Sequence, residues 1–104
     1  MTLKHLFRLS YNAAKEKGFW DNPRNDGEMI ALMHSELSEA LEGIRHGNPK
    51  SEHIPKFTAE EEEIADLLIR VGDYSEGKKL RIEEAIIAKL AFNQTRPKKH
   101  GKQF

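Results

Sequence analysis

Residues 28–46, EMIALMHSELSEALEGIRH, decide the fold of this chain. Apolar side chains recur in this stretch every three or four residues, and Gly47, Asn48 and Pro49 follow it as a strong helix terminator. The spacing predicts an amphipathic α-helix that buries one broad apolar stripe. That stripe consists of Ile30, Met33, Leu37, Ala40, Leu41 and Ile44.

The same periodicity predicts three more helices, and no stretch alternates between apolar and polar residues as a half-buried strand would. Thr2 is the predicted N-cap of the first helix, and Thr58 with Glu61 forms a predicted capping box for the third. Gly18 and Pro97 are the predicted stop signals of the first and last helix. These three helices are expected over about residues 3–17, 58–75 and 81–95.

The composition predicts one all-α domain over residues 1–104, with residues 98–104 as a loose basic tail. Seventeen Lys and Arg balance seventeen Asp and Glu, so charge gives no reason to expect a nucleic-acid polymer or a membrane as partner. The absence of cysteine excludes a disulfide scaffold, a thiol nucleophile and a cysteine zinc site. No signal peptide or membrane span is recognisable, so we expect a cytoplasmic protein. A domain this small is only modestly stable alone, which favours partner subunits.

Two pairs of carboxylates occupy one flank of adjacent helices. Glu36 and Glu39 are three residues apart on the second helix, and Glu63 and Asp66 stand at the same offset on the third. The third helix has its own apolar stripe, which consists of Ile64, Leu67, Leu68 and Val71. If the two helices pack through their stripes, four carboxylates converge. Oxygen ligands without cysteine favour a hard cation, Mg²⁺ or Mn²⁺.

A bland interpretation competes with this one. A single pair of acidic residues three apart on a helix is usually solvated surface, and acidic residues such as Glu60–Glu63 favour the first turn of a helix through its macrodipole. Two pairs at matching offsets shift the balance toward a metal site.

The fourth helix carries a second polar pattern. Its face begins with Ile82, Ala85 and Ile86 and continues with Lys89, Asn93 and Arg96. The functional interpretation is that the two cations meet phosphate oxygens while the amide fixes a hydroxyl, a base or a metal-bound oxygen. The alternative is a helix end that projects into water, with basic residues complementing the helix dipole.

These motifs resemble the MazG-like all-α nucleoside triphosphate pyrophosphohydrolases. The order Glu36-x-x-Glu39, a gap of 23 residues, then Glu63-x-x-Asp66 is similar to the family signature, as are residues 34–41 and 62–71. The ending Lys89-x-x-x-Asn93-x-x-Arg96 with Pro97 is similar as well. The resemblance covers about residues 18–104, nearly the whole chain.

The resemblance implies an intersubunit helical bundle, a homodimer or homotetramer, and Mg²⁺-dependent cleavage of a nucleoside triphosphate to monophosphate and pyrophosphate. It makes the four acids metal ligands and Lys89, Asn93 and Arg96 candidates for polyphosphate binding. Trp20 becomes the candidate for stacking on the nucleobase, although a core aromatic that plugs the end of the bundle is the interpretation that its pattern favours. Asp73 is a candidate outer ligand, and Arg70 is expected to pair with Asp66 or Asp73.

Three other functions remain open from the sequence. The sequence gives little support to a ferritin-like di-iron site, because no histidine here follows a glutamate by three residues. A non-enzymatic helical module for oligomerisation or binding would leave the acid pairs as surface residues. Hydrolysis of phosphoribosyl-ATP would use similar acid motifs. Metal dependence separates the module from the hydrolases.

Overall fold

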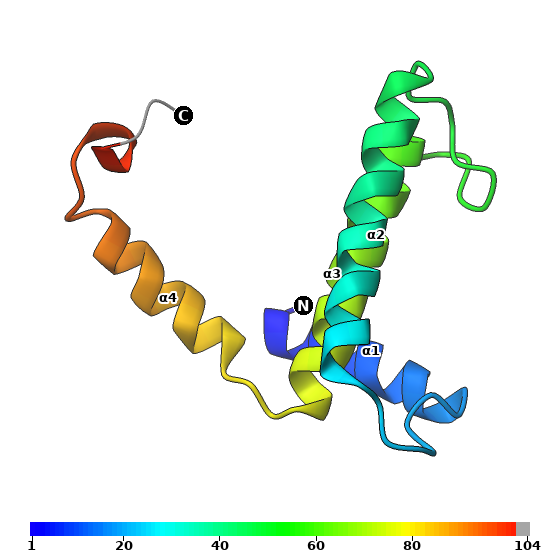
Figure 1. Cartoon of the computed structure of the whole chain (residues 1–104), viewed down its shortest axis with the longest axis horizontal. Helices are drawn as coiled ribbons and strands as arrows, with labels where there is room; N and C mark the ends of the chain where they lie inside the picture. The colour runs from blue at the N-terminus through cyan, green and yellow to red at the C-terminus, as the bar shows by residue number, and fades with distance from the viewer. Residues whose placement is uncertain (102–104) are drawn as a thin grey trace.

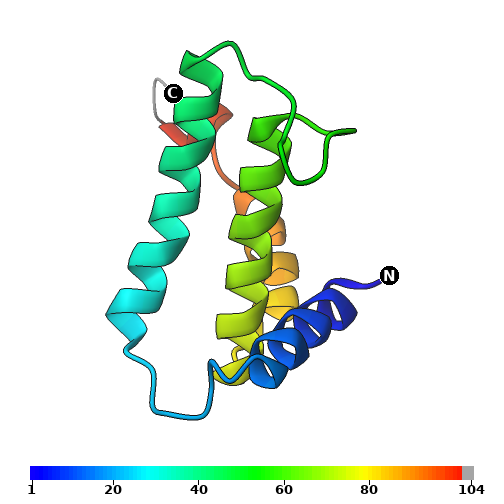
Figure 2. The same ribbon diagram turned by 90° about the vertical axis from the view of Figure 1, so that its right-hand side faces the viewer.

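The computed structural model describes residues 1–101, in which there are four α-helices and no strand. They are α1 (Leu3–Glu16), α2 (Asp26–Arg45), α3 (Ala59–Gly77) and α4 (Ile82–Asn93). α2 and α3 lie side by side and antiparallel, α1 crosses the C-terminal half of α3, and α4 leads away from this group (Figures 1 and 2). The prediction of an all-α chain with four helices is therefore confirmed.

The helix ends follow the local signals closely. The Thr2 side chain accepts a hydrogen bond from the His5 N–H, and the capping box of Thr58 and Glu61 is complete. α2 begins at Asp26, two residues earlier than expected, because the Asn25 side chain accepts from the Glu28 N–H and caps it. α3 extends to Gly77 rather than ending at about residue 75, and α4 is shorter than expected at both ends.

The first four residues of the tail that was expected to be loose, Lys98–Gly101, form a 3-10 helix, and residues 102–104 lie outside the described residues. Within the part of the chain that the structure describes, none of the helices combines the length and the hydropathy that a bilayer span requires.

The expected packing of α2 against α3 is wrong. Most of the large residues in their apolar stripes do not lie between the two helices, although Ala40 of the α2 stripe does. Leu41 of α2 is 50% exposed and Leu68 of α3 is 46% exposed. The helices instead meet along a line that includes Met29, Glu36 and Ala40, all buried. Small residues allow this approach, since a Cβ added at Gly43 would lie 3.2 Å from the Ala59 Cβ.

The two stripes turn to the same side of the antiparallel pair, because each lies about one residue's rotation from the contact line. We call this surface the outer apolar face. It consists of Ile30, Leu37, Leu41 and Ile44 of α2 with Ile64 and Leu68 of α3, all exposed. The sequence pattern identified these residues as apolar surface that must be buried, but no helix of the described chain covers them.

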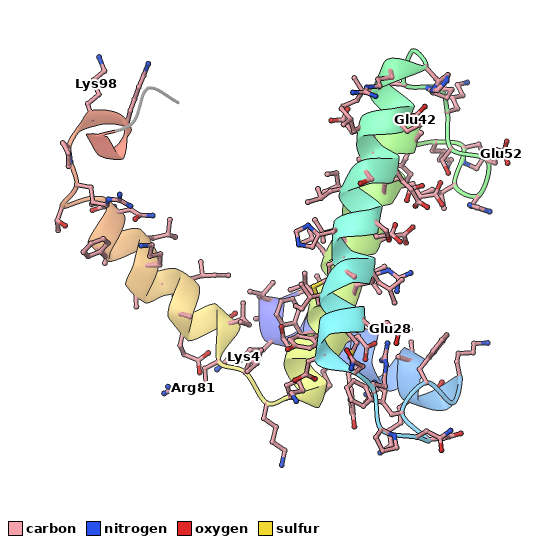
Figure 3. The ribbon with its side chains drawn as sticks, in the orientation of Figure 1. Lys4, Glu28, Glu42, Glu52, Arg81 and Lys98 are labelled. Atoms are coloured by element: carbon pink, nitrogen blue, oxygen red, sulfur yellow. The ribbon has the colours of Figure 1, made fainter. Side chains whose placement is uncertain are left out.

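α4 also exposes apolar side chains. Its apolar residues do not form a single stripe, and Ile87 is 66% exposed. Its first turn is tied to α1, where Lys4 Nζ lies 3.4 Å from a Glu84 carboxylate oxygen and 3.9 Å from one of Glu83. From Arg81 to Lys98 the segment runs away from α2, so most of its side chains stand free of the other helices (Figure 3).

α1 is held against α3 at a glycine. A Cβ added at Gly72 would lie 2.9 Å from Phe7 Cδ1 and 3.1 Å from Phe7 Cα. The absence of a side chain there allows the two helix backbones to approach and buries Phe7 and Ser10.

We predict that Gly72→Ala destabilises the protein by up to about 2 kcal/mol. Helix propensity alone gives a gain of about 1 kcal/mol for this change, but overpacking against the Phe7 backbone costs about 1–3 kcal/mol. Denaturant unfolding followed by circular dichroism measures the difference. Gly43→Ala is the comparison, because its new Cβ meets a single methyl group and can be accommodated by a small shift. A Gly72→Ala variant more stable than the wild type would contradict the close approach.

Candidate metal centre

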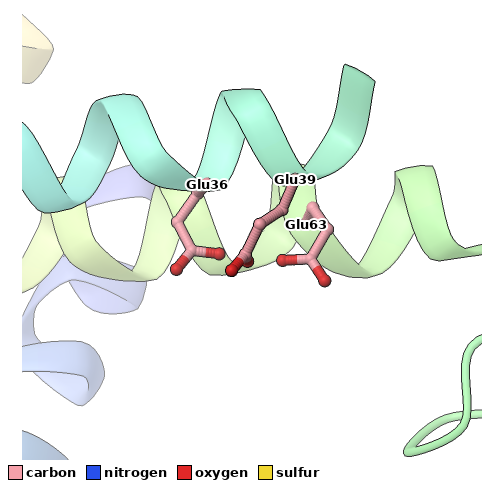
Figure 4. Close-up of side chains that lie close together, drawn as sticks. All are labelled: Glu36, Glu39 and Glu63. Carbon is pink, nitrogen blue, oxygen red and sulfur yellow. The ribbon is translucent and has the colours of Figure 1, made fainter. Parts of the chain in front are cut away.

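Carboxylates from α2 and α3 converge at the contact between these helices. Glu36 and Glu39 of α2 and Glu63 of α3 each offer an oxygen, and these oxygens lie within 4.8 Å of one another (Figure 4). Glu62, Glu63 and Asp66 form a second group of the same size that shares Glu63. We call the five residues the carboxylate cluster. It contains all four acids expected from the sequence and adds Glu62. In the sequence Glu62 is one of four consecutive glutamates, Glu60–Glu63, and its spacing did not single it out.

Two carboxylate oxygens of the cluster are buried without a partner. Glu36 is only 6% exposed, and its Oε2 makes no hydrogen bond within the described residues. Glu63 Oε2 is likewise buried and makes no hydrogen bond within the described residues. A buried acceptor without a donor costs stability unless a cation or a proton satisfies it. The donor set, oxygen atoms only, fits a hard divalent cation such as Mg²⁺ or Mn²⁺.

The crowded acids change each other's affinity for protons. Burial raises the pKa of Glu63 to about 8, and hydrogen bonds and charge from Glu39 and Glu36 add to this. Burial also raises the pKa of Asp66, together with the charges of Glu36 and Glu62, while the Arg70 cation opposes the rise. At neutral pH the metal-free cluster therefore keeps a proton, which a divalent cation would displace.

Glu62 is held by the loop that precedes α3. The buried Ser51 hydroxyl donates to Glu62 Oε1, and His53 Nδ1 lies 2.8 Å from Glu62 Oε2. These hydrogen bonds lower the pKa of Glu62, and the Glu62 carboxylate raises the pKa of His53. Glu62 consequently stays charged and faces the loop as well as the cluster.

Arg70 and Asp73 differ from the expectation. Arg70 does not pair with Asp66 or Asp73: its Nε donates to Glu36 Oε1 at 3.1 Å. Asp73 is buried, and both of its oxygens are engaged, one by Trp20 Nε1 at 2.7 Å and the other by Arg24 at 2.8 Å. The two ion pairs interlock α2, α3 and the turn between α1 and α2. Asp73 thus has structural partners in place of the outer-ligand role.

Trp20 lies at a junction of three segments. Besides its hydrogen bond to Asp73, its ring is covered by the Arg24 guanidinium at 4.8 Å and contacts the Tyr11 ring at 5.5 Å. A Cβ at Gly77 would lie 2.4 Å from the indole, so the ring rests against the end of α3. Stacking of Trp20 on a nucleobase stays a prediction, and it requires Arg24 to leave the ring face.

A cavity of about 370 Å³ lies beside the carboxylate cluster, between α1, the turn and α3. Glu36, Asp66 and Asp73 line it, and Phe19 and Ile69 are among its apolar walls. Lys17, Arg24 and Arg70 supply three cations to the same walls. The cavity therefore combines apolar walls with charged groups of both signs, and two acids of the cluster, Glu36 and Asp66, line it.

The structure does not bring the polar residues of α4 to the cluster. Lys89 Nζ lies 4.6 Å from the centroid of the Phe92 ring, and the Arg96 guanidinium lies 5.8 Å from it. Asn93 Oδ1 is buried without a hydrogen-bond partner among the described residues. α4 leads away from the α2–α3 pair (Figure 1), so the phosphate-binding role of Lys89, Asn93 and Arg96 stays a prediction.

No protein-family model, curated protein or solved structure matches this chain.

We predict that the metal-free protein loses stability as the pH rises from about 6 to about 8.5. The pKa of Glu63 is raised to about 8 in the folded state. Between its unfolded value and that pH, the folded protein therefore binds more protons than the unfolded chain, and its stability falls as those protons leave. The melting temperature in chelator, measured across this range, checks the slope.

Mg²⁺ should reverse this trend, because it takes the place of the proton. The rise in melting temperature on adding Mg²⁺ is expected to grow with pH. His53, whose pKa is also raised, contributes a slope of the same sign. Glu63→Gln separates the two, since it removes the Glu63 contribution and leaves that of His53. A wild-type slope in this variant would contradict the assignment.

Proposed function

We propose that this chain is a Mg²⁺-dependent nucleoside triphosphate pyrophosphohydrolase that releases a nucleoside monophosphate and pyrophosphate. The observation that carries the proposal is the convergence of Glu36, Glu39 and Glu63, with buried carboxylate oxygens that lack partners. The resemblance to MazG-like enzymes supports it, because the family signature names the same acids and Asp66.

The proposed mechanism assigns each group a task. Glu36, Glu39, Glu63 and Asp66 would hold the metal, and the bound ion would neutralise the oxygens of the polyphosphate. A carboxylate of the cluster orients the attacking water and takes its proton. The water oxygen bonds to phosphorus as the anhydride bond between the α- and β-phosphates breaks, and pyrophosphate leaves with the electron pair.

The proposal includes a homodimer or homotetramer. The outer apolar face is too large a run of exposed aliphatic residues to remain in water, and a second copy of the same helix pair would cover it as an intersubunit bundle. α4 has only 12 residues and exposes large apolar side chains, so neighbours would stabilise it. A partner's α4, with the residues that follow it, would supply Lys89, Asn93 and Arg96 to the polyphosphate.

One alternative function is supported by a separate structural observation. The outer apolar face by itself suits a non-enzymatic helical module that binds a partner. Phosphoribosyl-ATP hydrolysis would use the same acids. An assay of pyrophosphate release with Mg²⁺ across the common ribo- and deoxyribonucleotides, with phosphoribosyl-ATP included, decides among the three.

We predict that Glu39→Gln and Glu63→Gln each reduce pyrophosphate release by more than about a hundredfold and remove the stabilisation by Mg²⁺, because each deletes an anionic ligand. The helical fold should persist by circular dichroism. Glu42→Gln is the matched control: Glu42 lies one turn further along α2, exposed and paired with His46. Variants of Glu39 and Glu63 that keep both activity and the response to Mg²⁺ would remove the cluster from the site.

We predict that Leu41→Glu separates the subunits. It places an unpaired charge in the outer apolar face, which costs about 3–5 kcal/mol in a buried interface and weakens assembly by at least about a hundredfold. Sedimentation velocity measures the mass. Ala31→Glu, at an exposed position of the same helix whose neighbours three and four residues away do not belong to the face, should leave the assembly intact. A wild-type protein that sediments as a monomer would sink this part of the proposal.

A further inference from the structure

Arg70 combines an anchored end with an open end. Its Nε donates to Glu36 Oε1 at 3.1 Å, which fixes the guanidinium against α2. The terminal Nη1 and Nη2 groups take no part in that hydrogen bond. The side chain is still 39% exposed and lines the cavity beside the carboxylate cluster. An arginine that served only to join two helices would have no need to face a cavity.

Glu36 connects this arginine to the metal centre. One oxygen of its carboxylate accepts from Arg70, and the other is buried without a hydrogen-bond partner among the described residues. Glu36 also supplies an oxygen to the cluster, so a ligand held by the cluster would lie near the guanidinium. The Arg70 charge also opposes the rise in the pKa of Asp66, so its field reaches across the cluster.

The surroundings favour an anion at this place. Lys17 and Arg24 line the same cavity as Arg70, and the Arg24 charge is balanced by Asp73. A divalent cation would offset the charges of Glu36 and Asp66, the two cluster acids in the cavity wall, and Lys17 and Arg70 would remain as cations of that wall. The planar fork of an arginine fits two oxygens of a phosphate group better than a lysine does.

We propose that Arg70 binds a phosphate oxygen of the ligand held at the carboxylate cluster, with Glu36 as the group that positions it. This inference rests on the proposed function, since it assumes that the cluster binds a metal. It assigns phosphate recognition to a residue of the same chain as the acids, independently of α4.

The test uses the full chain and two probes, Mg²⁺ alone and inorganic tripolyphosphate at saturating Mg²⁺, with binding measured by calorimetry. Arg70→Gln should weaken tripolyphosphate binding by about tenfold to a hundredfold, which is the worth of a charge-assisted hydrogen bond. The same variant should bind Mg²⁺ as tightly as the wild type or tighter, because a cation next to the acids is gone. Arg70→Lys, which keeps the charge without the fork, should lie between. Arg45→Gln, an exposed arginine of α2, is the matched control.

The opposite response of the two probes separates this role from a structural one. Parallel loss of Mg²⁺ and tripolyphosphate affinity in Arg70→Gln would mean that Arg70 only holds Glu36, and unchanged tripolyphosphate affinity would overturn the proposal directly. If Arg70→Gln does not fold, Arg70→Lys decides: a loss of about fivefold or more supports the proposal and wild-type affinity overturns it. Failure of the wild type to bind Mg²⁺ would instead overturn the proposed function, and this inference with it.

Discussion

Mutual repulsion of carboxylates at the contact between α2 and α3 is the constraint on which the rest of the structure depends. Five acidic residues lie where two helices meet, with one of them buried at 6% exposure. Like charges at that distance are tolerated only when something balances them. In the metal-free protein the balance comes from the Arg70 cation on Glu36 and from a proton that Glu63 retains. A divalent cation would replace the proton and leave the arginine in place.

The same helix pair presents two faces of opposite character. One side gathers the acids, the cavity and the ion pairs, and the other is the outer apolar face. The contact between α2 and α3 includes Met29, Glu36 and Ala40, while large aliphatic side chains such as Leu37 and Leu41 are directed to a surface that another subunit would cover. α4 likewise exposes large apolar side chains, Ile87 and Leu90 among them.

The sequence predicted the helices well because their signals are local. Caps such as Thr2 and the box of Thr58 and Glu61 act within one turn, and the structure contains both. The shared flank of each acid pair also follows from helical geometry alone, whereas the meeting of the acids in two groups that share Glu63 depends on how α2 and α3 pack. Packing was harder. Leu37 and Leu41 have the periodicity of a core stripe, and that periodicity is the same whether the stripe faces its own chain or a second one. Which acid Arg70 selects, and the capture of Asp73 by Trp20 and Arg24, depend on distances between helices that spacing along the chain does not contain.

The junction around Trp20 gives the protein a built-in optical reporter. Trp20 is the single tryptophan of the chain, and its indole contacts α1 through Tyr11, α3 through Asp73 and Gly77, and the cavity wall through Arg24. Indole emission responds to nearby charge and to water. Any event that draws Arg24 toward an anion in the cavity, or that lifts α1 from α3, therefore changes the fluorescence of one identified residue, without a label and without background from other tryptophans.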